Sequence, residues 1–140
     1  MKVLRFLPVA FFAAAIFSSC SKSENPDLSI IQAESVIPGS YKMHFYSDET
    51  GADNPFVGYT FKFNAGGILL VDDGTTEYNG LWTIENAVNS DTYDQEVQIS
   101  ISGTDDLDKL SNVWYVFEVT DVSMFLEGTG IDNKAQFIKF

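Results

Sequence analysis

The sequence predicts an all-β domain of eight short antiparallel strands that follows a removable leader. Apolar and polar residues alternate with a period of two in several segments after Gly39, as in strands that bury one face. Turn signals rich in glycine, asparagine and aspartate separate these segments, and no helical repeat lies between them. Consecutive strands should therefore pair as hairpins, which points to an up-and-down barrel or a sandwich.

Residues 1–19 have the pattern of a cleaved export signal. Lys2 and Arg5 precede an apolar run over residues 6–17. A run of this length makes roughly 18 Å of helix, too short for the ~30 Å hydrocarbon core of a membrane. Ser18-Ser19-Cys20 then resembles the lipobox of bacterial lipoproteins, in which the cysteine receives the lipid. An ordinary signal peptide with an incidental cysteine is the alternative.

The segment that follows is predicted to be a tether. Residues 20–27 comprise the lipidated Cys20 and a polar stretch without apolar residues, which is typical of a flexible linker. Two or three acyl chains on Cys20 would anchor the protein firmly in a membrane. Residues 28–140 are left for the folded domain, which we place in the cell envelope, at the outer membrane. Whether it faces the periplasm or the outside stays open.

Composition excludes several classes of partner. The formal charge is −12, and loss of Lys2 and Arg5 with the leader brings the mature chain to −14. Nucleic-acid binding and electrostatic docking on anionic lipid both need basic patches, so neither is expected. The single cysteine excludes an internal disulfide and a thiolate metal cluster. The abundant aromatic residues nevertheless supply enough apolar surface for a folded core.

Two helical segments and eight strands are expected along the domain. Residues 28–37 predict a short N-terminal helix that Pro38-Gly39 ends. Residues 104–112 predict one helical turn, with Asp105 as its cap and Leu107 and Leu110 on one face. The predicted strands cover residues 41–46, 57–64, 68–71, 78–84, 96–102, 113–119, 122–126 and 135–140.

The aromatic residues on inward faces are the candidate ligand-lining residues. The alternation places these side chains inside the domain: Tyr59, Phe61, Phe63, Trp82 and Trp114. They either fill the core, since an eight-stranded barrel is only just wide enough for its own side chains, or line a pocket for a small apolar molecule. We expect Trp82 to belong to the core more firmly than Trp114, which lies near a predicted barrel mouth.

Some strands are apolar on both faces. Tyr115, Phe117 and Phe125 lie opposite residues assigned to the interior. Either the N-terminal helix covers them, or they form an exposed patch that a partner uses.

Catalytic constellations are not apparent, so we expect a protein that is not an enzyme and needs no cofactor. His44 is the only histidine and falls on an outward face, without partners for a triad or a metal site. Asp105, Asp106 and Asp108 could bind calcium, but their spacing lacks the glycine and distal glutamate of an EF-hand. Helix capping accounts for the same residues, so no metal is predicted.

Several motifs together resemble a known family. They are Gly39-Ser40-Tyr41-Lys42-Met43, Gly58-Tyr59-Thr60-Phe61-Lys62-Phe63-Asn64, Gly80-Leu81-Trp82-Thr83-Ile84, Trp114-Tyr115-Val116 and Phe137-Ile138-Lys139. In this order they resemble the lipocalin-like lipoproteins of Bacteroidetes. Tyr41 and Leu81 depart from the family pattern, which has Trp and Thr there. The resemblance implies an eight-stranded lipocalin-like barrel and supports no particular activity.

The function expected from the sequence is therefore binding at the cell envelope. The leading hypothesis is a membrane-anchored lipoprotein, held by Cys20, that binds a small hydrophobic ligand or a protein partner. The alternative is a protein-interaction module without a pocket, such as an envelope-assembly subunit or an enzyme inhibitor. A cavity inside the barrel would favour the first hypothesis and a filled interior the second.

Overall fold

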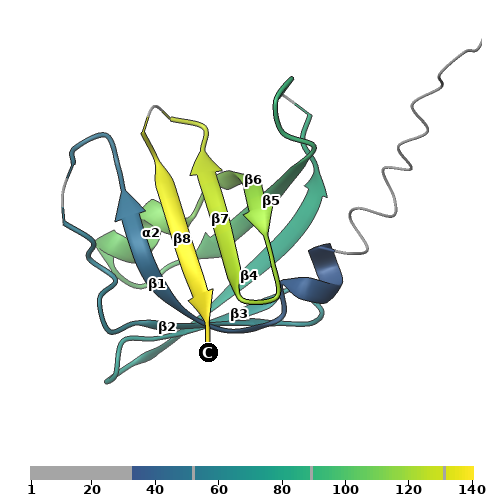
Figure 1. The fold of residues 1–140 in the computed structure, drawn as a ribbon. Coiled ribbons are helices and arrows are strands. Elements are labelled where there is room, and N and C mark those ends of the chain that lie inside the picture. The colour runs from purple at the N-terminus through teal and green to yellow at the C-terminus, as the bar shows by residue number, and fades with distance from the viewer. Residues whose placement is uncertain (1–32, 52, 89, 131) are drawn as a thin grey trace, which may run out of the picture.

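The chain folds into a closed antiparallel barrel, seen in the computed structural model of Figure 1. The structure describes residues 33–51, 53–88, 90–130 and 132–140, so the predicted leader, the tether and Cys20 lie outside the described residues. Each strand pairs with its neighbours in sequence, and β8 returns to β1. The strands are β1 (Gly39–Ser47), β2 (Thr60–Asn64), β3 (Ile68–Asp72), β4 (Glu77–Asn86), β5 (Gln95–Ile101), β6 (Val113–Val119), β7 (Ser123–Gly128) and β8 (Lys134–Lys139).

The predicted all-β fold, with its eight strands in up-and-down order, is confirmed, and the sandwich is excluded. Residues 33–36 form a short helix, α1, that stops before Pro38. Proline has no amide hydrogen, so Pro38 cannot continue the hydrogen bonds of the helix. Gly39 follows it and is the first residue of β1. The predicted helix start, at residues 28–32, lies outside the described residues.

The strand β1 contains a bulge that reverses the predicted orientation of its last residues. Its register against β8 shifts between Met43 and Phe45. Because an extra residue in one strand inverts the alternation, Tyr46 points inward and is buried, whereas Phe45 is on the outside. The alternation of Tyr41, Met43 and Phe45 with Lys42 and His44 predicts that Phe45 faces the interior, and this prediction is wrong, although His44 is exposed as expected.

The second strand is shorter than predicted. Residues 55–58 form a turn, and Val57, which the alternation assigned to the strand, is 79% exposed. The side-chain oxygen of Asn54 accepts a hydrogen bond from the backbone N–H of Phe56, 2.9 Å away, and this turn carries Phe56 into the core. The alternation of apolar residues at Val57 and Tyr59 thus predicted a strand start that is too early, because the strand begins only at Thr60.

The helix α2 (Asp105–Leu110) lies between β5 and β6. Its cap is Thr104, not Asp105 as predicted: Thr104 has an extended backbone, and its hydroxyl oxygen accepts a hydrogen bond from the N–H of Leu107. Asp105 is already the first helical residue, where a carboxylate favours the helix dipole. Leu107 and Leu110 are buried on one face, as predicted.

The order of the elements defines two ends of the barrel. The α1 end carries α1, the β2–β3, β4–β5 and β6–β7 hairpins and the end of β8. The α2 end carries α2, the β1–β2 loop and the β3–β4 and β7–β8 hairpins. In Figure 1, α2 lies behind β1 and the dark blue turn of α1 lies beside the β6–β7 hairpin. Among the described residues, no helix is long and apolar enough to cross a membrane.

Candidate functional site

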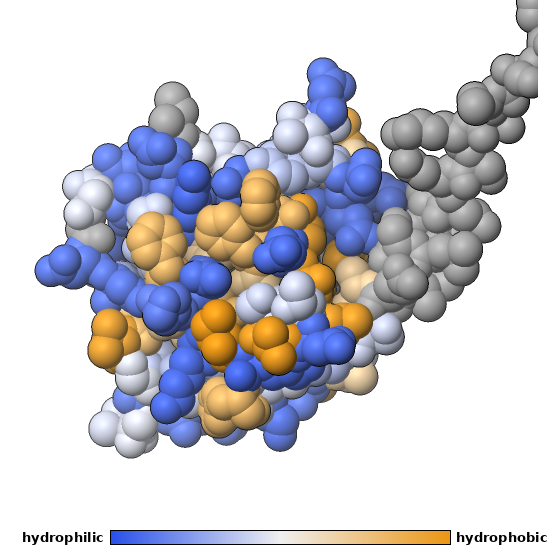
Figure 2. Space-filling view, viewed as in Figure 1, coloured by the Kyte–Doolittle hydropathy of each residue, from blue (hydrophilic) through white to orange (hydrophobic). Residues whose placement is uncertain are grey.

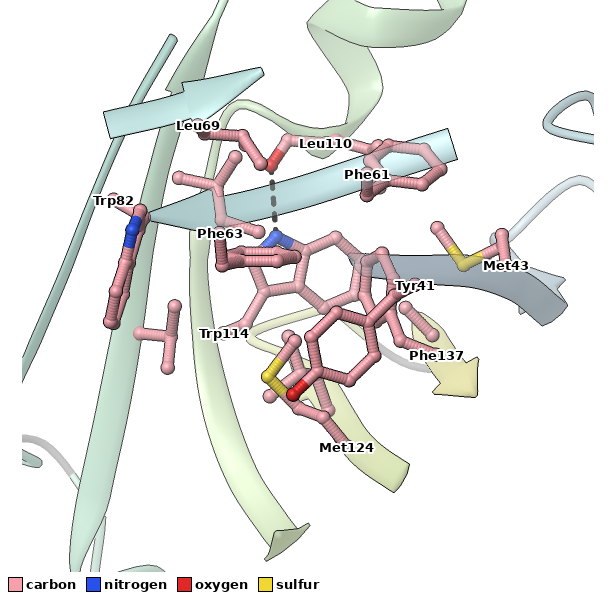
Figure 3. Close-up of a cluster of buried hydrophobic side chains, with 14 of the residues drawn as sticks. Tyr41, Met43, Phe61, Phe63, Leu69, Trp82, Leu110, Trp114, Met124 and Phe137 are labelled. Atoms are coloured by element: carbon pink, nitrogen blue, oxygen red, sulfur yellow. Dashed lines mark hydrogen bonds between the residues drawn. The ribbon is translucent and has the colours of Figure 1, made fainter. Parts of the chain in front are cut away.

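Aromatic side chains occupy the interior of the barrel (Figure 3). The ring of Phe137 meets the rings of Tyr41, Phe61 and Phe63 edge-on, with centroids 6.4, 5.2 and 5.7 Å apart. Phe63 also makes an edge contact with Trp82, at 5.8 Å. These separations are in the preferred range for edge-to-face pairs, so the rings pack against one another without room for another molecule between them.

The structure brings four of the five candidate lining residues into this cluster. Phe61 and Phe63 are fully buried, and Trp114 and Trp82 are 1% and 4% exposed. Trp114 is therefore buried at least as deeply as Trp82, contrary to the predicted order. Tyr59 is only partly buried and stacks on Phe61 from the α2 end, because the chain has not yet entered β2 at this residue.

The α2 end is closed by the helix itself. Leu107 and Leu110 belong to the same buried cluster as the rings. The indole N–H of Trp114 donates a hydrogen bond to the carbonyl oxygen of Leu110, 3.0 Å away. A buried tryptophan needs a partner for its N–H, and this bond also satisfies a carbonyl at the helix end.

The α1 end is closed by Ala33 and Ile37, which are buried in the same cluster. The hydroxyl of Tyr41 donates a hydrogen bond to the carbonyl oxygen of Ile37 at 2.7 Å. Burial raises the pKa of Tyr41 to about 12, so this hydroxyl stays neutral and keeps donating at physiological pH. Trp82 donates its indole N–H to the carbonyl oxygen of Asn64 at 3.0 Å. Aromatic side chains in the core thus find partners for their polar atoms in the chain itself.

A groove of about 750 Å³ lies at the α1 end, between α1, the β4–β5 hairpin and β6. Ala33 and Val36 line it on one side, and Val116, Phe117 and Val119 line it on the other. None of the five candidate lining residues borders this groove. The strand alternation could not indicate this groove, because it forms where the single described turn of α1 meets the wall of the barrel.

The acidic residues of α2 are arranged as in an ordinary capped helix. Asp105, Asp106 and Asp108 lie in its first turn, and Lys109 forms an ion pair with Asp106 at 3.1 Å. Within the described part of the chain, no group of three or more histidine, cysteine, aspartate or glutamate residues could hold a metal ion. His44 is exposed on the outer wall.

The carboxylate of Asp73 has the most perturbed acidity among the acidic groups described. Hydrogen bonds from the side chain of Thr75, from the backbone N–H groups of Thr76 and Thr75, and from the hydroxyl of Tyr78 lower the pKa of Asp73 to about 2. All these donors belong to the β3–β4 turn and the strand after it. The arrangement stabilises an Asx turn and presents no group for catalysis.

An apolar patch covers the outer wall near the α1 end. We define the β6–β8 patch by five side chains, which are Phe117, Val122, Phe125, Ile138 and Phe140. Figure 2 shows apolar side chains gathered on this face, over β8 and the β6–β7 hairpin. Of the two alternatives, cover by the helix or an exposed patch, the exposed patch applies to Phe117, which is 58% exposed, whereas Phe125 is half-buried beside it. Tyr115 is instead stacked on Tyr93, with ring centroids 5.1 Å apart.

Comparisons with protein-family models, with curated proteins and with solved structures found no match to this chain. The resemblance to lipocalin-like lipoproteins therefore stays a prediction from the sequence motifs.

Proposed function

We propose that this protein is a lipid-anchored module of the cell envelope that binds a polypeptide partner through its outer surface. The observation that carries the proposal is the filled interior. The ring cluster around Phe137 occupies the space that a lipocalin-like pocket would need, and α1 and α2 close the two mouths. A small hydrophobic ligand would have to displace buried side chains, which costs several kcal/mol in a close-packed core.

The outer surface supports the same proposal. Exposed apolar patches on small proteins mark contacts with proteins or membranes, because exposed apolar area is otherwise kept low. Apart from the β6–β8 patch, Ile68 and Leu81 are partners in the register of β3 and β4, and their side chains are 48% and 60% exposed on the outer wall. This surface is available to a polypeptide partner. An envelope-assembly subunit and an enzyme inhibitor are both modules of this kind, and both work without a catalytic constellation.

A titration with an apolar fluorescent fatty acid, cis-parinaric acid, tests the filled interior. The wild-type protein should show no saturable binding at one molecule per barrel, because packed aromatic side chains occupy the interior. Phe140→Ala serves as the matched control, since it removes a surface ring and leaves the interior unchanged. Stoichiometric binding that both proteins share would contradict the proposal and restore the pocket hypothesis.

Metabolic labelling with a radioactive fatty acid tests the anchor. The wild-type chain should incorporate label, and Cys20→Ala should lose it, because the thiol is the only predicted attachment point for the diacylglyceryl group. Label retained on Cys20→Ala would overturn the lipoprotein assignment.

A further inference from the structure

The β6–β8 patch is continuous across three strands and the C-terminal residue. The rings of Phe117 and Phe125 meet edge-on at 5.2 Å. Ile138 lies opposite Ser123 in the register of β7 and β8, and the N–H of Lys139 donates to the carbonyl oxygen of Val122 at 2.8 Å. Exposure is high where the patch projects furthest, at 64% for Val122 and 70% for Phe140. A hairpin tip and a chain end thus carry apolar side chains into the solvent.

The patch borders the place where the anchored chain enters the domain. The ammonium group of Lys139 donates to the carbonyl oxygen of Val36 at 3.0 Å, so the end of β8 is fastened to α1. Phe117 and Val119 line the groove whose other wall is α1. From Cys20 to Ala33 the chain can span at most about 45 Å. A lipid on Cys20 would therefore hold the domain within this distance of the bilayer, with α1 as the part of the domain nearest to the anchor along the chain.

The charges of the domain are distributed unevenly between its two ends. The loops and the helix at the α2 end carry many carboxylates, among them Asp48, Asp72, Asp73, Asp105, Asp106, Asp108 and Asp132. Among the described lysines, Lys42, Lys62 and Lys139 lie on β1, β2 and β8 towards the α1 end, whereas Lys109 and Lys134 lie at the α2 end. The α1 end carries carboxylates as well, including Glu34, Asp91 and Asp94, but fewer than the α2 end. The carboxylates nearest to the patch in sequence are Glu118 and Asp121. An anionic surface would therefore repel the α2 end most strongly and turn the α1 end toward itself.

One lysine belongs to the edge of the patch. The ammonium group of Lys42 lies 5.4 Å from the centre of the Phe140 ring, and Lys42 is opposite Ile138 in the register of β1 and β8. A lysine whose stem runs along an apolar surface keeps its charge at the polar boundary. This arrangement suits the headgroup region of a membrane, where aromatic and aliphatic side chains enter the acyl boundary and lysines meet phosphates.

We propose that the β6–β8 patch lies on the surface of the lipid bilayer, so that the α2 end faces away from the membrane. This inference rests on the lipid anchor of the proposed function. Insertion of the apolar side chains of the patch into the bilayer supplies the binding energy, and the lysines orient the domain. The net negative charge of the chain therefore does not prevent binding to the membrane.

Spin labels at two exposed valines test the orientation. The full chain is expressed with its leader, purified and reconstituted into vesicles of phosphatidylethanolamine and phosphatidylglycerol. Val122→Cys places the label in the patch, and Val57→Cys, 79% exposed at the α2 end, is the matched control. Collision rates with oxygen, which concentrates in the bilayer, and with a water-soluble nickel chelate then report the depth of each label.

We expect the label at Val122→Cys to collide several-fold more often with oxygen, relative to the chelate, than the label at Val57→Cys. Equal, water-like ratios at both sites in chains that float with the vesicles would overturn the inference and leave the patch to a protein partner. Dipolar broadening between labels at Val122→Cys would overturn it in favour of a second copy. Labelling of Cys20 in the wild-type chain, with no flotation, would instead refute the lipid anchor, because a lipidated sulfur takes no label.

Discussion

The indole N–H of Trp114 donates to the carbonyl oxygen of Leu110, and both side chains are about 1% exposed. The bond joins the last turn of α2 to the strand that follows it, β6. Because Leu110 also packs into the ring cluster, the helix and the barrel core share one buried unit. The cover of the α2 end is thus part of the folded core and not a separate lid.

We expect Trp114→Ala to lower the free energy of unfolding by about 3 to 5 kcal/mol, because it removes a buried ring and leaves a cavity. Trp114→Phe keeps most of the ring and loses the donor to Leu110, so its cost should be smaller, about 1 to 3 kcal/mol. Urea denaturation measures both. Val57→Ala, at an exposed site, should stay within about 0.5 kcal/mol of wild type. A cost near that of Val57→Ala for Trp114→Ala would show that the interior is not filled.

Tyr41→Phe should destabilise the protein by about 1 to 3 kcal/mol at neutral pH, because the carbonyl oxygen of Ile37 loses its buried donor. The pKa of Tyr41 is raised from 10.0 to about 12 in the folded state. Its contribution to stability is therefore complete below pH 10 and is lost as the pH rises toward 12. The stability of Tyr41→Phe should accordingly fall less steeply than that of wild type over this interval in urea titrations. Parallel slopes would contradict the burial of the hydroxyl.

Substitutions at two neighbouring glycines measure the cost of backbone strain separately from the cost of a steric clash. Gly66 and Gly67 have φ angles of +88° and +86°, so alanine is strained at both positions. A Cβ atom at Gly67 would lie 2.9 Å from the carbonyl oxygen of Trp82, whereas a Cβ at Gly66 would meet nothing within 4 Å. Gly67→Ala should therefore cost more than Gly66→Ala, by roughly 1 to 3 kcal/mol. Equal costs in thermal unfolding would mean that the β2–β3 turn adjusts to relieve the contact.

The carboxylate of Asp73 should titrate at about 2 in a carbon-13 NMR titration of the folded protein, below its ordinary value of 3.8. Thr75→Val removes the first and largest cause, the hydroxyl donor, so the pKa of Asp73 should rise toward 3.8. Thr76→Val is the matched control, because Thr76 donates through its backbone N–H, which the substitution retains. A rise of the same size in Thr76→Val would contradict the assignment of the donors.

Patterns of apolar residues were sufficient to predict the strands and the inward position of the main core aromatics. Phe61, Phe63, Trp82 and Trp114 lie inside, since an inward-facing ring in a strand has only the core to enter. The same patterns failed at Phe45 and Val57. A bulge and a turn each break the period of two, and both depend on contacts with strands far away in the sequence or on side-chain bonds such as that of Asn54.

The candidate site was harder to predict than the fold. Alternation assigns a residue to a face but does not give the volume left inside, so a filled core and a lined pocket have the same sequence pattern. Val122 and Phe140 could not be recognised as exposed either, because each lies just outside a strand, Val122 before β7 and Phe140 after β8, where the alternation does not assign a face. Only the closed geometry places them beside Ile138.

The pairing of β1 with β8 has a consequence for the timing of folding. Tyr41 and Lys139 are partners in that register, so the first and last strands in the sequence pair with each other and close the barrel. A chain emerging from the ribosome cannot close the barrel until nearly its whole length has been synthesised, because contacts between distant residues form late. Late closure of the barrel suits the export that we propose, because a chain has to be unfolded while it passes through a secretion channel. Once the barrel closes, every described strand has a paired neighbour on each side, which leaves only short stretches of edge to a neighbouring chain.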